Sequence, residues 1–127
     1  MDNMTVMLLG ASADLTECPV GEFEVSRLSK KLGQPFMVKG RALTMREFDD
    51  MPKENFKQHV ILKAVFEPDF KDADLASKMK PQGRKTPLTP IEVIDELFLP
   101  GEIVNLYNCI TELSGFGDDA VAKIQKN

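Results

Sequence analysis

The sequence predicts an α+β fold, with an N-terminal β-hairpin followed by a mainly helical bundle of four to five short helices. Apolar and polar residues alternate before the glycine at position 33, and a second extended run follows it. Two capping sequences precede runs with helical spacing further along the chain. At 127 residues with 43% apolar composition, the chain fits one domain. We expect that domain at residues 22–117, after a weakly patterned segment 1–21 and before a frayed tail 118–127.

The N-terminal half begins with an ambiguous stretch and then a hairpin pattern. Residues 4–9 are compatible with a short strand or a short helix. Phe23 and Val25 then alternate with polar residues, and residues 31–34 form a turn-like sequence that contains glycine. A second extended run covers residues 35–43. Two such runs joined by a short glycine loop are typical of a β-hairpin.

A capping box predicts a short helix directly after the hairpin. The Thr44 hydroxyl is placed to accept the backbone N–H of Glu47, and the Glu47 carboxylate the backbone N–H of Thr44. Leu43 and Phe48 are spaced to pack together across the helix start. Pro52 ends the helix, because proline cannot continue it beyond about residue 51.

The middle of the chain contains one stretch with two interpretations. Residues 54–66 favour a helix by their length, although residues 59–66 also form an acceptable buried strand. Residues 67–70 then break the regular structure. A further short helix is expected at residues 72–79, where acidic residues stand at the start and lysine at the end, as the helix dipole favours.

Two amphipathic helices are predicted in the last third of the chain. Thr89 and Glu92 repeat the capping box, with Pro90 at the first helical position. The helices meet at residues 99–101, and Gly115 is placed to end the second one in the left-handed conformation. The apolar face of the second helix comprises Ile103, Leu106, Tyr107, Ile110 and Leu113.

Composition excludes several classes of function. The formal charge of −4 and the pI near 5.0 give no general attraction to nucleic acid or anionic lipid. No apolar run is long enough for a membrane span, and no secretory signal precedes the domain, so we expect a cytoplasmic protein without a membrane partner. Cys18 and Cys109 lack metal-ligand spacing and are expected to be reduced thiols.

No catalytic, metal or cofactor motif is recognisable. His59 is the single histidine, and no cysteine or carboxylate is patterned around it. The acidic pairs lack the ligand positions of a calcium loop, and the glycines lack phosphate-binding spacing. We therefore expect no enzymatic activity, no cofactor, no metal and no small-molecule substrate.

The basic stretch at residues 78–85 supports an alternative function, that of a small DNA-associated regulatory domain. It contains Lys78, Lys80, Arg84 and Lys85. Against this interpretation, the whole chain is acidic and no aromatic residues are interleaved with these charges. A nucleic-acid partner is therefore not the favoured prediction.

Three segments resemble the XkdN-like tail assembly chaperones of contractile-tailed phages and prophages. They are a basic hairpin leading into a Leu-Thr-x-x-Glu-Phe helix start (residues 23–48), an apolar helix ending in Ala-Val-Phe-Glu-Pro-Asp-Phe (residues 64–70), and a Leu-Pro-Gly-Glu helix closing on Gly-Phe (residues 96–116). The resemblance covers about residues 22–117. It implies a non-enzymatic assembly factor, and some relatives also exist as a longer frameshift product.

The resemblance also implies a partner and a location. Such proteins bind the long tape measure protein, keep it soluble in the bacterial host cytoplasm, and are absent from the mature virion. Seven methionines and eight phenylalanines in a small domain leave apolar surface for such a partner or for self-association. We hypothesise that the helix-in-groove mode applies and that Phe98, Ile103, Tyr107 and Phe116 contribute to the groove.

Overall fold

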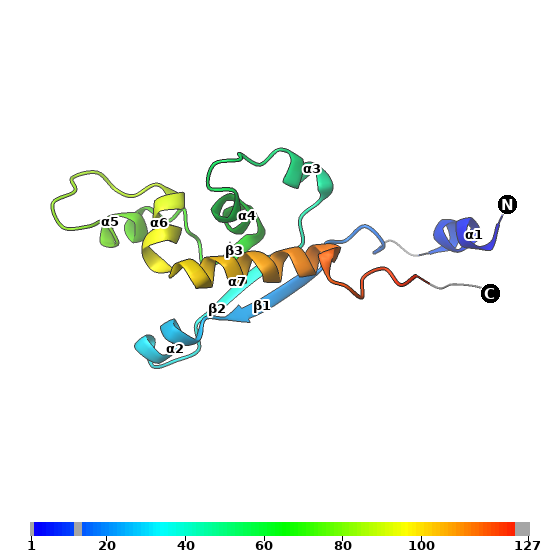
Figure 1. Cartoon of the computed structure of the whole chain (residues 1–127), viewed down its shortest axis with the longest axis horizontal. Helices are drawn as coiled ribbons and strands as arrows, with labels where there is room; N and C mark the ends of the chain where they lie inside the picture. Colours follow the sequence, from blue (N-terminus) through cyan, green and yellow to red (C-terminus); the bar gives the residue numbers. More distant parts are fainter. Residues whose placement is uncertain (1, 12–13, 124–127) are drawn as a thin grey trace.

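The computed structural model describes residues 2–11 and 14–123 (Figure 1). Seven α-helices, a π-helical turn and a three-stranded antiparallel sheet lie within these ranges. In chain order the elements are α1 Asn3–Gly10, β1 Val20–Glu24, α2 Ser26–Leu32, β2 Met37–Arg41, α3 Met45–Asp49, α4 Phe56–Ala64, β3 Val65–Glu67, α5 Ala73–Lys78, α6 Pro90–Leu97, α7 Pro100–Thr111 and η1 Glu112–Phe116.

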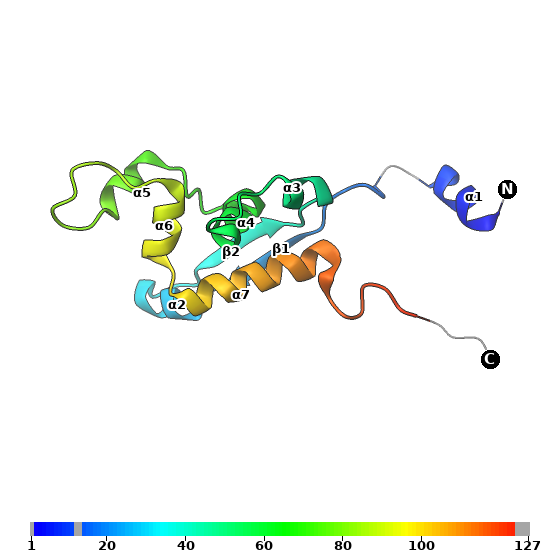
Figure 2. The same cartoon turned by 45° about the horizontal axis from the view of Figure 1, so that its top comes forward.

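The sheet has the order β1-β2-β3, with β2 at its centre and both pairs antiparallel. Phe23 of β1 lies opposite Val38 of β2, and Gly40 of β2 lies opposite Val65 of β3. Helix α7 runs along the sheet from the α2 end to the end where β1 begins, as both views show (Figures 1 and 2). Helix α4 packs against both α6 and α7.

The predicted N-terminal hairpin is wrong, and so is the prediction of four to five short helices, because the described residues form seven; the α+β content is broadly right. The strands are spread along the chain, since α2 separates β1 from β2 and the third strand comes after α4. Gly33 does not turn one strand into the next. With φ of 72° it ends α2, and its N–H donates to the carbonyl of Ser29. Residues 26–32 form helix α2, whose one buried residue is Leu28.

The core lies between the sheet and helices α4, α6 and α7. Its most deeply buried large side chains are Val38, Val60, Ile61, Val93, Ile94 and Ile110. Burial of each such side chain contributes about 1.5–3 kcal/mol, and the six come from four elements, so the core ties the sheet to all three helices. The described residues include no buried polar or charged side chain.

Both predicted capping boxes are confirmed. The Glu47 N–H donates to the Thr44 hydroxyl at 3.2 Å, and the Thr44 N–H donates to the Glu47 carboxylate at 3.0 Å. The corresponding distances between Thr89 and Glu92 are 3.3 and 2.9 Å. Each box fixes a helix start by local hydrogen bonds alone, which explains why the sequence reveals it.

The ambiguous stretch at residues 54–66 contains both predicted structures in succession. Helix α4 covers Phe56–Ala64, and the chain then turns directly into β3. The first residue of the protein, residues 12–13 and residues 124–127 lie outside the described ranges. The proposed segments 1–21 and 118–127 are therefore described only in part, and the division into a 22–117 domain with two flanking segments stays a prediction.

Candidate partner-binding site

Two shallow hollows lie along one face of α7, and together we call them the α7 groove. Its first hollow, of about 430 Å³, is lined by Lys57, Gln58, Asp95, Phe98, Pro100, Ile103 and Val104. Its second hollow, of about 390 Å³, is lined by Met45, Phe48, Asp49, Phe56, Tyr107, Thr111 and Phe116. The α7 residues in these sets recur every three to four positions, so they lie on one side of the helix.

Tyr107 joins the two hollows. Its ring lies in the second hollow, and the Nζ atom of Lys57, which lines the first, lies 5.2 Å from the ring centroid. This is a cation–π distance, and it holds the stem of Lys57 along the groove. The Phe56 ring packs edge to face on Tyr107 with centroids 6.1 Å apart. The start of α4 is thereby fixed against α7.

The far end of the groove is an aromatic and methionine surface. The rings of Phe48 and Phe116 meet edge to face with centroids 5.7 Å apart. Phe116 nevertheless remains 65% exposed, and Met45 beside it remains 70% exposed. Exposed aromatic and methionine side chains on a fixed backbone are typical of surfaces that bind other proteins.

Charged groups of both signs stand among the groove residues. Lys57 is exposed, and Asp95 accepts a hydrogen bond from the Gln58 side chain at 2.9 Å. Asp49 is exposed in the second hollow. The groove thus combines an apolar floor with a mixed charged margin, which suits a partner with an apolar stripe between polar sides.

All four residues proposed from the sequence line the α7 groove. Phe98 and Ile103, at 3% and 7% exposure, form the floor of the first hollow. Tyr107 is half-buried and Phe116 is exposed in the second hollow. Their role in binding stays a prediction.

Sequence reasoning missed the groove residues that come from α3 and α4. Met45, Phe48 and Phe56 come from α3 and α4, more than forty residues before Tyr107. The one sequence signal that could have found Met45 is its place as an apolar residue at the first position of a capped helix, where the structure leaves it 70% exposed. The sequence places Phe48 only as a local packing partner of Leu43.

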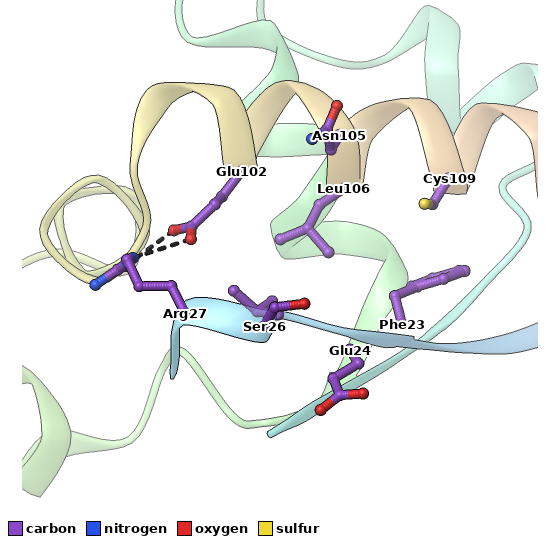
Figure 3. A pocket seen from close by; sticks show the side chains of 9 residues that line it. Phe23, Glu24, Ser26, Arg27, Glu102, Asn105, Leu106 and Cys109 are labelled. Atoms are coloured by element: carbon purple, nitrogen blue, oxygen red, sulfur yellow. Dashed lines mark hydrogen bonds and ion pairs between the residues drawn. The ribbon is translucent and has the colours of Figure 1, made fainter. Parts of the chain in front are cut away.

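A separate pocket outside the α7 groove, of about 260 Å³, lies between the β1–α2 segment and α7 (Figure 3). Arg27 reaches across it to Glu102 with two hydrogen bonds of 2.9 Å, and it also donates to the Leu97 carbonyl at 2.8 Å. This contact lowers the pKa of Glu102 below its ordinary value. The paired charges hold α2 against the corner between α6 and α7, which is a structural role.

The two cysteines and the histidine do not form a chemical centre in the described residues. Cys109 lines the pocket between the β1–α2 segment and α7. Burial raises the pKa of its thiol, which makes the thiolate less available. Cys18 is exposed in the segment before β1. His59 is half-buried on α4. Within residues 2–11 and 14–123, no cluster of three His, Cys, Asp or Glu side chains could hold a metal ion.

Arg84 in the basic loop is already paired within the chain. Its guanidinium binds both carboxylate oxygens of Glu92, at 2.6 and 2.9 Å, and also donates to the carbonyls of Thr86 and Pro87. Arg84 and the N–H of Thr89 lower the pKa of Glu92 to about 2. The central cation of this loop therefore fixes the loop to the start of α6.

A separate apolar surface is formed by α1. None of its residues is buried, and Met4, Met7, Leu8 and Leu9 are 62–71% exposed. No helix in the described part of the chain is long and apolar enough to cross a membrane. Helix α1, which carries these exposed apolar side chains, has only eight residues.

Comparison with known proteins gives two matches. The sequence profile of the phage XkdN-like tail assembly chaperone proteins matches residues 4–126. Among solved structures, the crystal structure of a protein named yqbn is similar, with a TM-score of 0.55 and 26% sequence identity over 78% of this chain and 88% of that chain. No curated protein matches.

Proposed function

The chain belongs to the phage XkdN-like tail assembly chaperone family, and from this premise we propose that it binds the tape measure protein and keeps it soluble during tail assembly. The family resemblance derived from the sequence is confirmed, and the profile match extends it to the N-terminal residues. We propose a non-enzymatic role in the cytoplasm of the bacterial host. The chaperone itself acts in assembly and, in our proposal, leaves before the virion is mature.

The α7 groove is the observation that supports this function best. Its α7 wall runs from Pro100 to Thr111, which at 1.5 Å per residue is a length of about 17 Å, or three helical turns. A helix with apolar residues at every third or fourth position presents a stripe that fits such an apolar floor. A long helical protein with such a stripe aggregates through it when it is uncovered. A small acidic domain bound along the stripe covers the apolar surface and adds repulsive charge.

Co-expression tests the proposal directly. The chain is produced together with the tape measure protein from the same genome, and the soluble fraction of that protein is measured. We expect Met45→Asp and Phe116→Asp to abolish solubilisation, because each places a charge on the exposed part of the groove. A buried interface residue contributes about 2 kcal/mol or more, which corresponds to a loss of affinity of roughly 30-fold.

Leu32→Asp is the matched control. Leu32 is 58% exposed on α2, outside the groove, so the same change in polarity at similar exposure is expected to leave solubilisation intact. Far-ultraviolet circular dichroism establishes that all three variants fold. If the two groove variants solubilise the tape measure protein as well as Leu32→Asp does, the groove is not the binding site. If the wild-type chain fails as well, the proposed partner is wrong.

The DNA-associated alternative is not favoured. The family match points to tail assembly, and Arg84, the centre of the basic stretch, forms its ion pair with Glu92 instead of extending into solvent. A phosphate backbone would have to compete with a bidentate carboxylate for the same guanidinium.

A further inference from the structure

The apolar side chains of helix α1 lie around its whole circumference, and none of them is buried. It contains Met4, Val6, Met7, Leu8 and Leu9, each more than half exposed, and residues 3–11 carry no charged side chain. A helix that is apolar around its whole circumference is normally buried. An isolated helix of eight residues is also marginal in water, since it lacks the length to repay nucleation. Both properties indicate that α1 docks on another surface.

The exposed area of the chain is large enough for a substantial interface. The solvent-accessible surface is 9454 Å², whereas a compact monomer of 14.2 kDa exposes about 6,800 Å². The difference is about 2,700 Å², and both α1 and the loop between α5 and α6 extend away from the body of the molecule (Figure 1). A stable interface requires only about 800 Å² from each partner.

The chain leaves the body beside the aromatic end of the α7 groove. The Pro19 carbonyl accepts the Ala42 N–H at 2.8 Å, and the next residue, Leu43, donates to the Ser114 hydroxyl at 3.0 Å. These bonds place the exit of the N-terminal segment next to the residues that precede α3 and next to η1. Both views show α1 beyond this end of the molecule, away from α3, α4 and α7 of its own body (Figures 1 and 2).

We propose that α1 of one copy docks in the α7 groove of a second copy, and that two copies exchange these helices about a two-fold axis. The length of α1, about 12 Å for eight residues, fits within the 17 Å of the groove wall. An uncharged helix matches the apolar floor, and the exchange makes an isologous dimer, which closes without exposing further surface. The inference shares the groove with the proposed function but needs no tape measure protein.

Sedimentation velocity of the full chain across a range of micromolar concentrations tests the proposal. We expect the wild type to form a dimer and Leu8→Asp to weaken that dimer by about 900-fold, because a charge replaces a central apolar side chain in both α1 helices and each loss is about 30-fold. Leu32→Asp, the matched change outside both surfaces, is expected to dimerise like the wild type. A wild type that stays monomeric, or a Leu8→Asp variant that dimerises like Leu32→Asp, overturns the proposal.

A mixing experiment identifies the surface that α1 contacts. Leu8→Asp keeps an intact groove, and Met45→Asp keeps an intact α1, so a mixture of the two retains one complete pair of surfaces. We expect each variant alone to be impaired and the mixture to regain part of the dimer. No recovery on mixing would mean that α1 pairs elsewhere, for instance with another α1, and would overturn the assignment to the groove.

The two proposals can fail separately. Leu8→Asp leaves the groove free, so solubilisation of the tape measure protein in co-expression is expected to persist while self-association is lost. If the dimer behaves as expected and co-expression fails, the proposed function is wrong and the inference stands. If co-expression succeeds and the wild type is a monomer, the proposed function stands and the inference about α1 is wrong.

Discussion

Glu47 shows how one carboxylate can organise several parts of a small domain. Its two oxygens bind the Arg41 guanidinium at 2.9 and 2.6 Å, and one of them also accepts the Thr44 N–H. Arg41 belongs to β2, so the same side chain caps α3 and ties it to the sheet. Arg41 first and the Thr44 N–H second lower the pKa of Glu47 to about 2. The native state therefore favours the ionised form.

The variant Glu47→Gln is expected to lower the free energy of unfolding by about 2 kcal/mol at pH 7, because it weakens a charge-assisted pair and a cap. The stabilisation by Glu47 is complete above its ordinary pKa of 4.5 and is lost as the pH falls towards about 2. Urea unfolding should therefore show the wild type and the variant converging over that interval. Glu54→Gln, at an exposed position, is the control and should match the wild type. A difference that stays constant down to pH 2 would contradict the assignment.

At the scale of the element, the glycine at the start of α7 and the glycine in η1, which follows α7, differ in the backbone conformation that they adopt. Gly101 lies in the first turn of the helix, and Gly115 lies in η1 with φ of 93°. A methyl group added at either position meets nothing within 4 Å, so the two sites differ in backbone conformation and not in space. Only Gly115 needs the left-handed conformation that other residues avoid.

Thermal or urea unfolding of two alanine variants tests this difference. Gly115→Ala is expected to destabilise the protein by about 1–2 kcal/mol, the cost of a left-handed conformation with a Cβ atom. Gly101→Ala is expected to stabilise it by about 0.5 kcal/mol or more, because alanine is the better helix former. Equal effects of the two substitutions would show that η1 adopts another backbone conformation in solution.

Elements fixed by neighbouring residues could be predicted from the sequence, whereas elements fixed by distant ones could not. The capping boxes at Thr44 and Thr89 and the left-handed Gly115 are local, and each is found where the sequence indicates it. The hairpin prediction failed because the period of residues 26–32 leaves strand and helix both possible, and packing of Leu28 into the core decides between them.

The same distinction applies to the candidate site. The α7 stripe that contains Ile103 and Tyr107 follows from helical spacing, and these residues line the groove. Met45 and Phe56 could not be assigned to the opposite side, because their nearness to α7 depends on how α3 and α4 pack over the sheet. Sequence spacing gives the face of one helix, but a groove needs two walls.

At the scale of the whole molecule, stability is distributed very unevenly along the chain. Residues 2–11 bury no side chain, whereas Ile110 is completely buried. The N-terminal segment is tied to the body where the Pro19 carbonyl accepts the Ala42 N–H. The melting temperature of the monomer should therefore change little when the first seventeen residues are removed. It should fall strongly when a buried side chain of α7 is shortened.

Differential scanning fluorimetry at low micromolar concentration tests this contrast. At concentrations where the wild type is monomeric, a chain that begins at Cys18 is expected to keep the wild-type melting temperature within about 2 °C, because the described residues that it lacks are not buried in the monomer. Ile110→Ala is expected to cost about 2–5 kcal/mol and to lower the melting temperature by about 10 °C or more. A large destabilisation on truncation would mean that α1 packs on its own body.

The position of α7 in the chain has a consequence for biosynthesis. Val60 and Ile61 of α4 are sealed by an α7 that begins only at Pro100 and contributes Ile103, Leu106 and Ile110 to the core. While the ribosome is still translating α7, the earlier strands and helices lack the wall that encloses them. Folding must therefore wait until nearly the whole domain has emerged from the exit tunnel, so the residues after Phe116 are translated before α7 can close the core.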